Sequence, residues 1–89
     1  MAALCAQILD RNAGITCVKA GYAAVEAGAD TAFNRYQAGR MSLGGLRTTL
    51  FGLERVYEAV ELAEAAVLIG DLRQAETQLD AAIEILNTL

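Results

Sequence analysis

The sequence contains no histidine, no proline, no tryptophan and only two cysteines among its 89 residues. Without histidine, the chain lacks the commonest general base and the commonest metal ligand. Cys5 and Cys17 have neither a CxxC spacing nor a histidine partner, which excludes the usual zinc sites and a thiol-protease centre. We therefore expect no enzymatic activity, no bound metal and no cofactor.

The absence of proline means that no position is barred from a helix by ring chemistry. The length and the hydrophobic content of 55% suffice for one domain with one core, over residues 1–89. No run of about 18 uncharged apolar residues is present, so we expect no membrane span. The N-terminus lacks the basic and apolar stretches of a signal peptide, which predicts a cytoplasmic location and reduced cysteines.

Charge is distributed unevenly along the chain. Residues 1–52 carry a net charge of +2 and residues 53–89 a net charge of −6. A chain that is acidic over its second half is unsuited to bind nucleic acid along its length, so we expect no direct contact with nucleic acid. The acidic half could instead receive a basic protein.

Apolar residues recur at spacings of three and four from residue 4 onward, with Arg11 at the one skipped place, which predicts one long helix over residues 2–38. The stripe consists of Leu4, Ile8, Ile15, Val18, Tyr22, Val25, Ala29, Ala32 and Tyr36. A break at residues 12–14 is the alternative, but the spacing keeps its phase across Gly14 and favours continuity. Gly39 stands where a glycine commonly ends a helix.

Ser42 is a favourable N-cap for a second helix over residues 43–69, which Gly70 would end. A second apolar stripe on this helix predicts that neighbours cover it on two sides; its members are Phe51, Leu62, Ala66 and Ile69. Asp71 would cap a third helix whose apolar face is Leu72, Ala75, Leu79, Ala82 and Leu86. The predicted fold is an all-α, three-helix domain: a long antiparallel helical hairpin plus a shorter C-terminal helix.

Small residues recur every seven positions on both arms of this hairpin. Gly14, Gly21 and Gly28 lie on the first arm, and the second carries Gly45, Gly52, Ala59 and Ala66. Antiparallel pairing of Gly28 with Gly52, Gly21 with Ala59 and Gly14 with Ala66 centres the turn at residue 40. We predict a close seam of small residues, which offsets the cost of about 1 kcal/mol for each helical glycine. The alternative is that the glycines mark frayed or kinked helix.

The two cysteines would be roughly 18 Å apart on one continuous helix that rises 1.5 Å per residue. A disulfide requires Cα atoms about 5.5 Å apart, so this geometry excludes a bridge between Cys5 and Cys17 within the chain. We expect buried thiols, with a bridge between subunits as the alternative.

Two short stretches resemble known families. GDLRQAETQLDAAIEI, residues 70–85, resembles the second helix of a tetratricopeptide repeat, with Gly70, Asp71, Ala75, Leu79 and Ala82 at motif positions. That family implies peptide binding by stacked helix pairs, but the period of about 34 residues does not recur. RYQAGRMSLGGL, residues 35–46, is similar to a helical-hairpin stretch of outer-membrane efflux channel proteins, a resemblance that also implies a signal peptide and barrel strands, neither of which we find.

Two apolar patches and one acidic face are the candidate binding sites. A helix over residues 2–38 would overhang its partner, so that Leu4, Ile8 and Leu9 form one patch, while Phe51 and Leu62 form another. Exposed apolar patches usually mark interfaces, and a two-fold dimer is the commonest way to bury one.

The function expected from these surfaces is non-catalytic protein–protein interaction, as an adaptor, chaperone or regulator that forms a homodimer. The alternative is a small acidic inhibitor that presents Glu54, Glu58 and Glu61 to a basic target, such as a protein that binds nucleic acid. An enzyme is the third class, and the residue inventory disfavours it. The sequence does not identify the partner.

Overall fold

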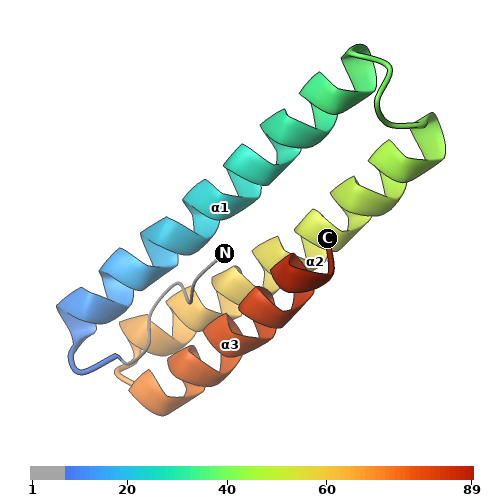
Figure 1. Cartoon of the computed structure of the whole chain (residues 1–89). Coiled ribbons are helices and arrows are strands. Elements are labelled where there is room, and N and C mark those ends of the chain that lie inside the picture. The colour runs from blue at the N-terminus through green and yellow to red at the C-terminus, as the bar shows by residue number, and fades with distance from the viewer. Residues whose placement is uncertain (1–7) are drawn as a thin grey trace.

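The computed structural model describes residues 8–89, and this part of the chain folds into three helices without strands. The helices are α1 (Arg11–Gln37), α2 (Leu43–Leu68) and α3 (Leu72–Thr88). Figure 1 shows α1 and α2 running antiparallel, with α3 packed along one half of their length. The predicted three-helix fold, with a long hairpin and a shorter third helix, is confirmed.

Each helix begins at a short acidic or hydroxyl side chain that accepts a backbone N–H bond three residues later. Asp10 accepts from Ala13 at 2.7 Å, Ser42 from Gly45 at 3.0 Å and Asp71 from Gln74 at 3.2 Å. Such caps satisfy one of the N–H groups that the first turn leaves without a helical partner. The predicted caps Ser42 and Asp71 are confirmed.

The same local rules end α1 and α2. Gly39 and Gly70 have positive φ angles of 74° and 82°, which glycine adopts without steric cost. The next N–H group reaches back to the helix in each case, from Arg40 to the Arg35 carbonyl at 2.8 Å and from Asp71 to the Ala66 carbonyl at 2.9 Å. This six-to-one bond defines the Schellman motif, so both glycines end their helices as predicted.

The start of α1 differs from the prediction. The helix begins at Arg11 rather than at residue 2, because Asp10 caps it and residues 8–10 are not helical. Residues 2–7 lie outside the described part of the chain. From Arg11 onward the helix runs through Gly14 without a break, but the predicted continuity with the preceding segment is wrong, because residues 8–10 are not helical.

The core lies where the three helices meet. It consists of Ile8, Cys17, Val18, Val56, Ala59, Val60, Ala63, Ala66, Val67, Ala75, Leu79 and Ala82. Many of its members on α2 and α3 are alanines, and small side chains let helix axes approach toward the short end of their usual range of about 8–10 Å. The α3 face predicted from the sequence is correct, since Ala75, Leu79 and Ala82 are buried.

The α1 glycines do form a close seam with α2, but the register is shifted by one residue from the prediction. A Cβ atom built on Gly14 would lie 2.8 Å from Val67, one on Gly21 would lie 2.8 Å from Val60, and one on Gly28 would lie 2.9 Å from Leu53. Each glycine therefore makes room for a branched apolar side chain, not for another small residue.

The small residues of α2 have other partners. A Cβ atom on Gly52 would lie 2.5 Å from Leu89, so this glycine faces the end of α3 instead of Gly28. Ala59 and Ala66 are buried in the core cluster that includes α3. The predicted close approach of α1 and α2 is correct, but the predicted partners of the α1 glycines are wrong.

The expectation of reduced thiols is wrong for Cys17, which is disulfide-bonded. The side chain is buried, with 1% of its surface exposed. A bridge within the chain was excluded on the assumption of helix from residue 2, but α1 begins only at Arg11. Cys5, the only other cysteine of the sequence, lies outside the described residues.

Candidate protein-interaction surface

Three of the exposed apolar side chains lie along the outer side of α2 and its C-cap. Ile69 is 80% exposed, Phe51 68% and Leu62 57%. They belong to one line of eight exposed positions along α2 and its C-cap residue, which we call the outer face: Gly44, Thr48, Phe51, Arg55, Glu58, Leu62, Ala65 and Ile69.

This face is exposed because α1 and α3 contact other sides of α2. Leu53, Val60 and Val67 fill the space beside the α1 glycines, and Ala63 and Ala66 lie in the core shared with α3. Neighbours thus cover α2 on two sides, as predicted, but the second stripe is only partly covered. Of its four members Ala66 is buried, while Phe51, Leu62 and Ile69 face solvent.

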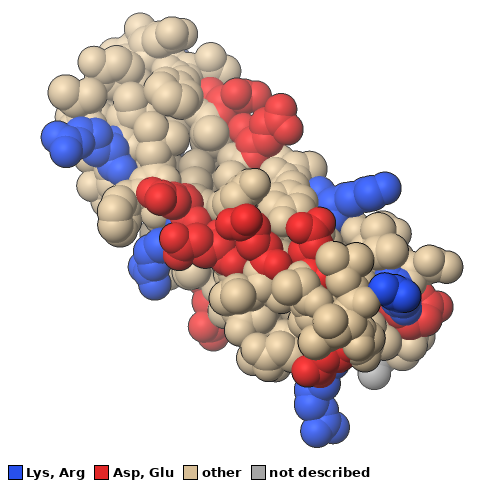
Figure 2. All heavy atoms as spheres, turned by 180° about the vertical axis from the view of Figure 1, so that it is seen from behind, with Lys and Arg blue, Asp and Glu red and all other residues tan. Residues whose placement is uncertain are grey.

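Acidic side chains border and interrupt the outer face. Glu54, Glu58 and Glu61 are all exposed, and Glu58 lies within the face, between Phe51 and Leu62 in the sequence. In Figure 2 acidic side chains gather over the middle of the face shown, with basic side chains nearer its ends and edges. The surface is therefore amphipathic, which suits a protein partner better than a lipid one.

The N-terminal patch is divided by the structure. Ile8 is 5% exposed and belongs to the core, and its N–H group donates to Glu76 Oε1 on α3 at 2.7 Å. Leu9 is 75% exposed, and Leu4 lies outside the described residues. An overhang of α1 that would bring these three side chains together does not form in the described part, because the helix begins at Arg11.

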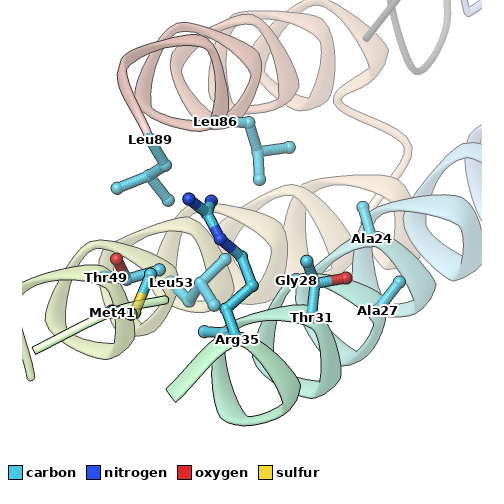
Figure 3. A pocket seen from close by; sticks show the side chains of 11 residues that line it. Ala24, Ala27, Gly28, Thr31, Arg35, Met41, Thr49, Leu53, Leu86 and Leu89 are labelled. Atoms are coloured by element: carbon cyan, nitrogen blue, oxygen red, sulfur yellow. The ribbon is translucent and has the colours of Figure 1, made fainter. Parts of the chain in front are cut away.

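A groove lies between the hairpin and the C-terminal end of α3. Its volume is ≈ 310 Å³, and Leu53, Leu86 and Leu89 form part of its apolar wall. Figure 3 shows the Arg35 side chain extending across it toward Leu86 and Leu89 at the end of α3. Sequence reasoning missed this groove, because it depends on where α3 stops relative to α2.

One titratable group on the α1–α2 surface has a shifted pKa. Partial burial, followed by the hydrogen bond to Glu64 and the charges of Glu64 and Glu61, raises the pKa of Tyr22 to about 12. The Tyr22 hydroxyl donates to Glu64 Oε1 at 3.0 Å, and its ring lies 5.2 Å from that of Tyr57. This phenol is therefore stabilised as a neutral donor, which makes it a poor base at physiological pH.

Within residues 8–89 no group of three or more His, Cys, Asp or Glu side chains is placed to hold a metal ion. None of the described helices is both long enough and apolar enough to cross a bilayer.

Comparison with known proteins gives no family to reason from. No family description matches the sequence, and neither a curated protein nor a solved structure resembles the chain at a significant level. The short resemblances to tetratricopeptide repeats and to efflux channel proteins are therefore without support from a family match. The surface itself has to carry any functional argument.

Proposed function

We propose that this protein is a non-catalytic interaction module that self-associates, and that the outer face of α2 is its contact surface. The observation that carries the proposal is the exposure of Phe51, Leu62 and Ile69 on one line of one helix. Burying three such side chains is favourable by roughly 25 cal/mol for each Å² of apolar surface removed from water. A homodimer is the simplest assembly that removes this surface on both chains at once.

Sedimentation equilibrium at micromolar concentration tests self-association. We expect a mass above that of the 9.4 kDa chain, which decreases on dilution. A clean monomer over the whole concentration range would refute the proposal.

A pair of matched variants tests the surface. Phe51 and Phe33 are both exposed, at 68% and 45%, but only Phe51 belongs to the outer face, because Phe33 lies on α1. Phe51→Gln should shift the equilibrium toward monomer, while Phe33→Gln should leave it unchanged. Equal effects of the two substitutions would show that general hydrophobicity, not this face, drives association.

The second candidate function is an acidic inhibitor of a basic protein, favoured by the exposed carboxylates of Glu54, Glu58 and Glu61. Binding of this kind should weaken steeply with salt. Oligolysine is a suitable probe. Its affinity is measured for wild type and for a variant with Glu54, Glu58 and Glu61 all changed to Gln. The control neutralises Glu26, Asp30 and Glu84 instead, and so removes the same charge elsewhere. A specific acidic site loses affinity only in the first variant.

A cytoplasmic location remains part of the proposal, and so does the absence of a cofactor and of catalysis. The disulfide at Cys17 points the other way for location, because disulfides are rare in the cytosol. Alkylation of the denatured protein, freshly extracted from its own cells, distinguishes a reducing compartment from an oxidising one. Labelled Cys17 supports a reducing compartment, and protected Cys17 an oxidising one.

A further inference from the structure

We infer that two copies of this chain pair antiparallel through the outer face of α2, in one register that places Phe51 against Leu62 of the second copy and Arg55 against Glu58 of the second copy. The inference rests on the proposed self-association and specifies its geometry.

The spacing of the outer face is the same when read in either direction. From Gly44 to Ile69 the steps are four, three, four, three, four, three and four residues. An antiparallel two-fold pairing matches each position with its counterpart counted from the other end. The axis then passes between Val56 and Tyr57, and every position of the face finds a partner.

The matched side chains are chemically complementary. Phe51 meets Leu62 of the second copy, and the symmetry repeats this apolar contact. Arg55 meets Glu58 of the second copy, also twice, so the two charged residues at the centre of the face are paired with opposite charges. Thr48 meets Ala65 of the second copy. The charges that interrupt the apolar row thus become part of the interface.

The ends of the face are complementary in shape. Ile69 is the most exposed of the large hydrophobic side chains in the described residues, at 80%. Its counterpart, Gly44, has no side chain, and a shallow hollow of ≈ 440 Å³ lined by Gly44, Arg47, Thr48 and Phe51 lies at that place. The pairing therefore seats Ile69 of one copy in the hollow of the other.

Other pairings of the same face bring unfavourable groups together. A parallel pair places Arg55 against Arg55 and Glu58 against Glu58, which costs free energy because like charges repel across an interface. An antiparallel pair shifted by one heptad in one direction keeps an apolar contact of Phe51 with Ile69 but places Glu58 against Leu62 and Arg55 against Ala65. A shift by one heptad in the other direction places Phe51 against Arg55 and Glu58 against Thr48. Of these pairings, only the proposed register matches Arg55 with Glu58 and Phe51 with Leu62.

Charge reversal tests this register. In a homodimer of Arg55→Glu, the new carboxylate at position 55 of each copy faces Glu58 of the other copy. In a homodimer of Glu58→Arg, the new guanidinium at position 58 of each copy faces Arg55 of the other copy. We expect each variant to raise the Kd of the homodimer by about tenfold or more. An equimolar mixture of the two variants should dimerise, because both contacts between unlike chains are then attractive.

The mixture isolates contacts between chains, since each chain keeps the same internal charges alone and mixed. Circular dichroism melts of the single variants check that they fold, and sedimentation of the mixture gives the readout. If wild type is a monomer, the proposed self-association fails. If wild type dimerises and both single variants dimerise equally well, self-association stands and this interface is wrong.

The carboxylates beside the face give a second test. In this register Glu54 and Glu61 of the second copy lie on the same flank and repel each other. Glu61→Gln should therefore tighten the dimer, while Glu58→Gln should weaken it. The two effects need not be equal in size. A dimer weakened by Glu61→Gln, or a dimer that Glu58→Gln does not weaken, contradicts the register.

Discussion

The two halves of the hairpin differ in how many helices share their core. We call the half next to the α2–α3 turn the base. All three helices contribute to the core cluster there, and Val56, Val60 and Ala75 are 0% exposed. The half next to the α1–α2 turn, here called the tip, buries Ala32, Leu46 and Leu53 outside that cluster.

The difference follows from helix length. At 1.5 Å per residue α2 is roughly 39 Å long and α3 roughly 26 Å, so α3 leaves part of the hairpin uncovered. The groove bordered by Leu53 and Leu89 lies where this cover ends. The base therefore owes its order to packing on several sides, and the tip depends mainly on contacts between α1 and α2.

Two matched leucine truncations should separate the halves most clearly. Leu79 in the base is 2% exposed and Leu53 in the tip is 3% exposed. Leu79→Ala should lower the free energy of unfolding by about 2–5 kcal/mol, because a closed core keeps the cavity. Leu53→Ala should cost less, because the neighbouring groove lets side chains and water fill the space. Chemical denaturation measures both, and equal costs would remove the distinction.

Glycine substitutions test the same difference on a smaller scale. Gly21→Ala gains about 1 kcal/mol of helix propensity but forces Val60 to move, and overpacking costs about 1–3 kcal/mol. Both Val60 methyl groups lie within 3.1 Å of the added Cβ atom, and a branched side chain has little freedom to rotate. We expect net destabilisation.

Gly28→Ala is the matched variant in the tip. The added Cβ atom would meet the end of the more flexible Leu53 side chain at 2.9 Å, beside the open groove. This substitution should be near neutral in thermal melts.

Gly21→Leu should be more destabilising than Gly21→Ala. A higher melting temperature for either Gly21 variant would refute the close seam.

The smallest effect concerns pH. The pKa of Tyr22 is raised to about 12 from an ordinary value of 10.0, so the folded state holds the phenol proton more tightly than the unfolded chain. This contribution to stability is complete below pH 10 and disappears as the pH rises toward 12. The stability difference between wild type and Tyr22→Phe should therefore decline over that interval, as measured by denaturant titration. A constant difference would contradict the shift.

The helix ends were predictable because they depend on a few neighbouring residues. Ser42, Asp71, Gly39 and Gly70 each act through bonds within one turn, which the sequence displays directly. The start of α1 was missed although Asp10 is the same kind of signal, because the apolar spacing continued through it into residues 4 and 8.

The interaction surface was only partly predictable. Phe51 and Leu62 were recognised as a patch, but Gly44, Arg55 and Ala65 became part of it only when the structure placed α1 and α3 on other sides of α2. The seam was found from its period, yet its partners were wrong by one residue, because periodicity does not determine the rotation of one helix against another. A bridge within the chain was excluded on the assumption of helix from residue 2, whereas α1 begins at Arg11.

The brevity of the two turns has a consequence for folding speed. Residues 38–42 and 69–71 connect the helices, so each pair of antiparallel neighbours is also adjacent in sequence. Most contacts then join residues of modest separation, and little chain entropy is lost before the first contacts stabilise a nucleus. Helical bundles, whose contact order is low as a class, fold within microseconds to milliseconds. Either hairpin can therefore serve as the starting point, and a chain emerging during synthesis can form α1 with α2 before α3 is complete.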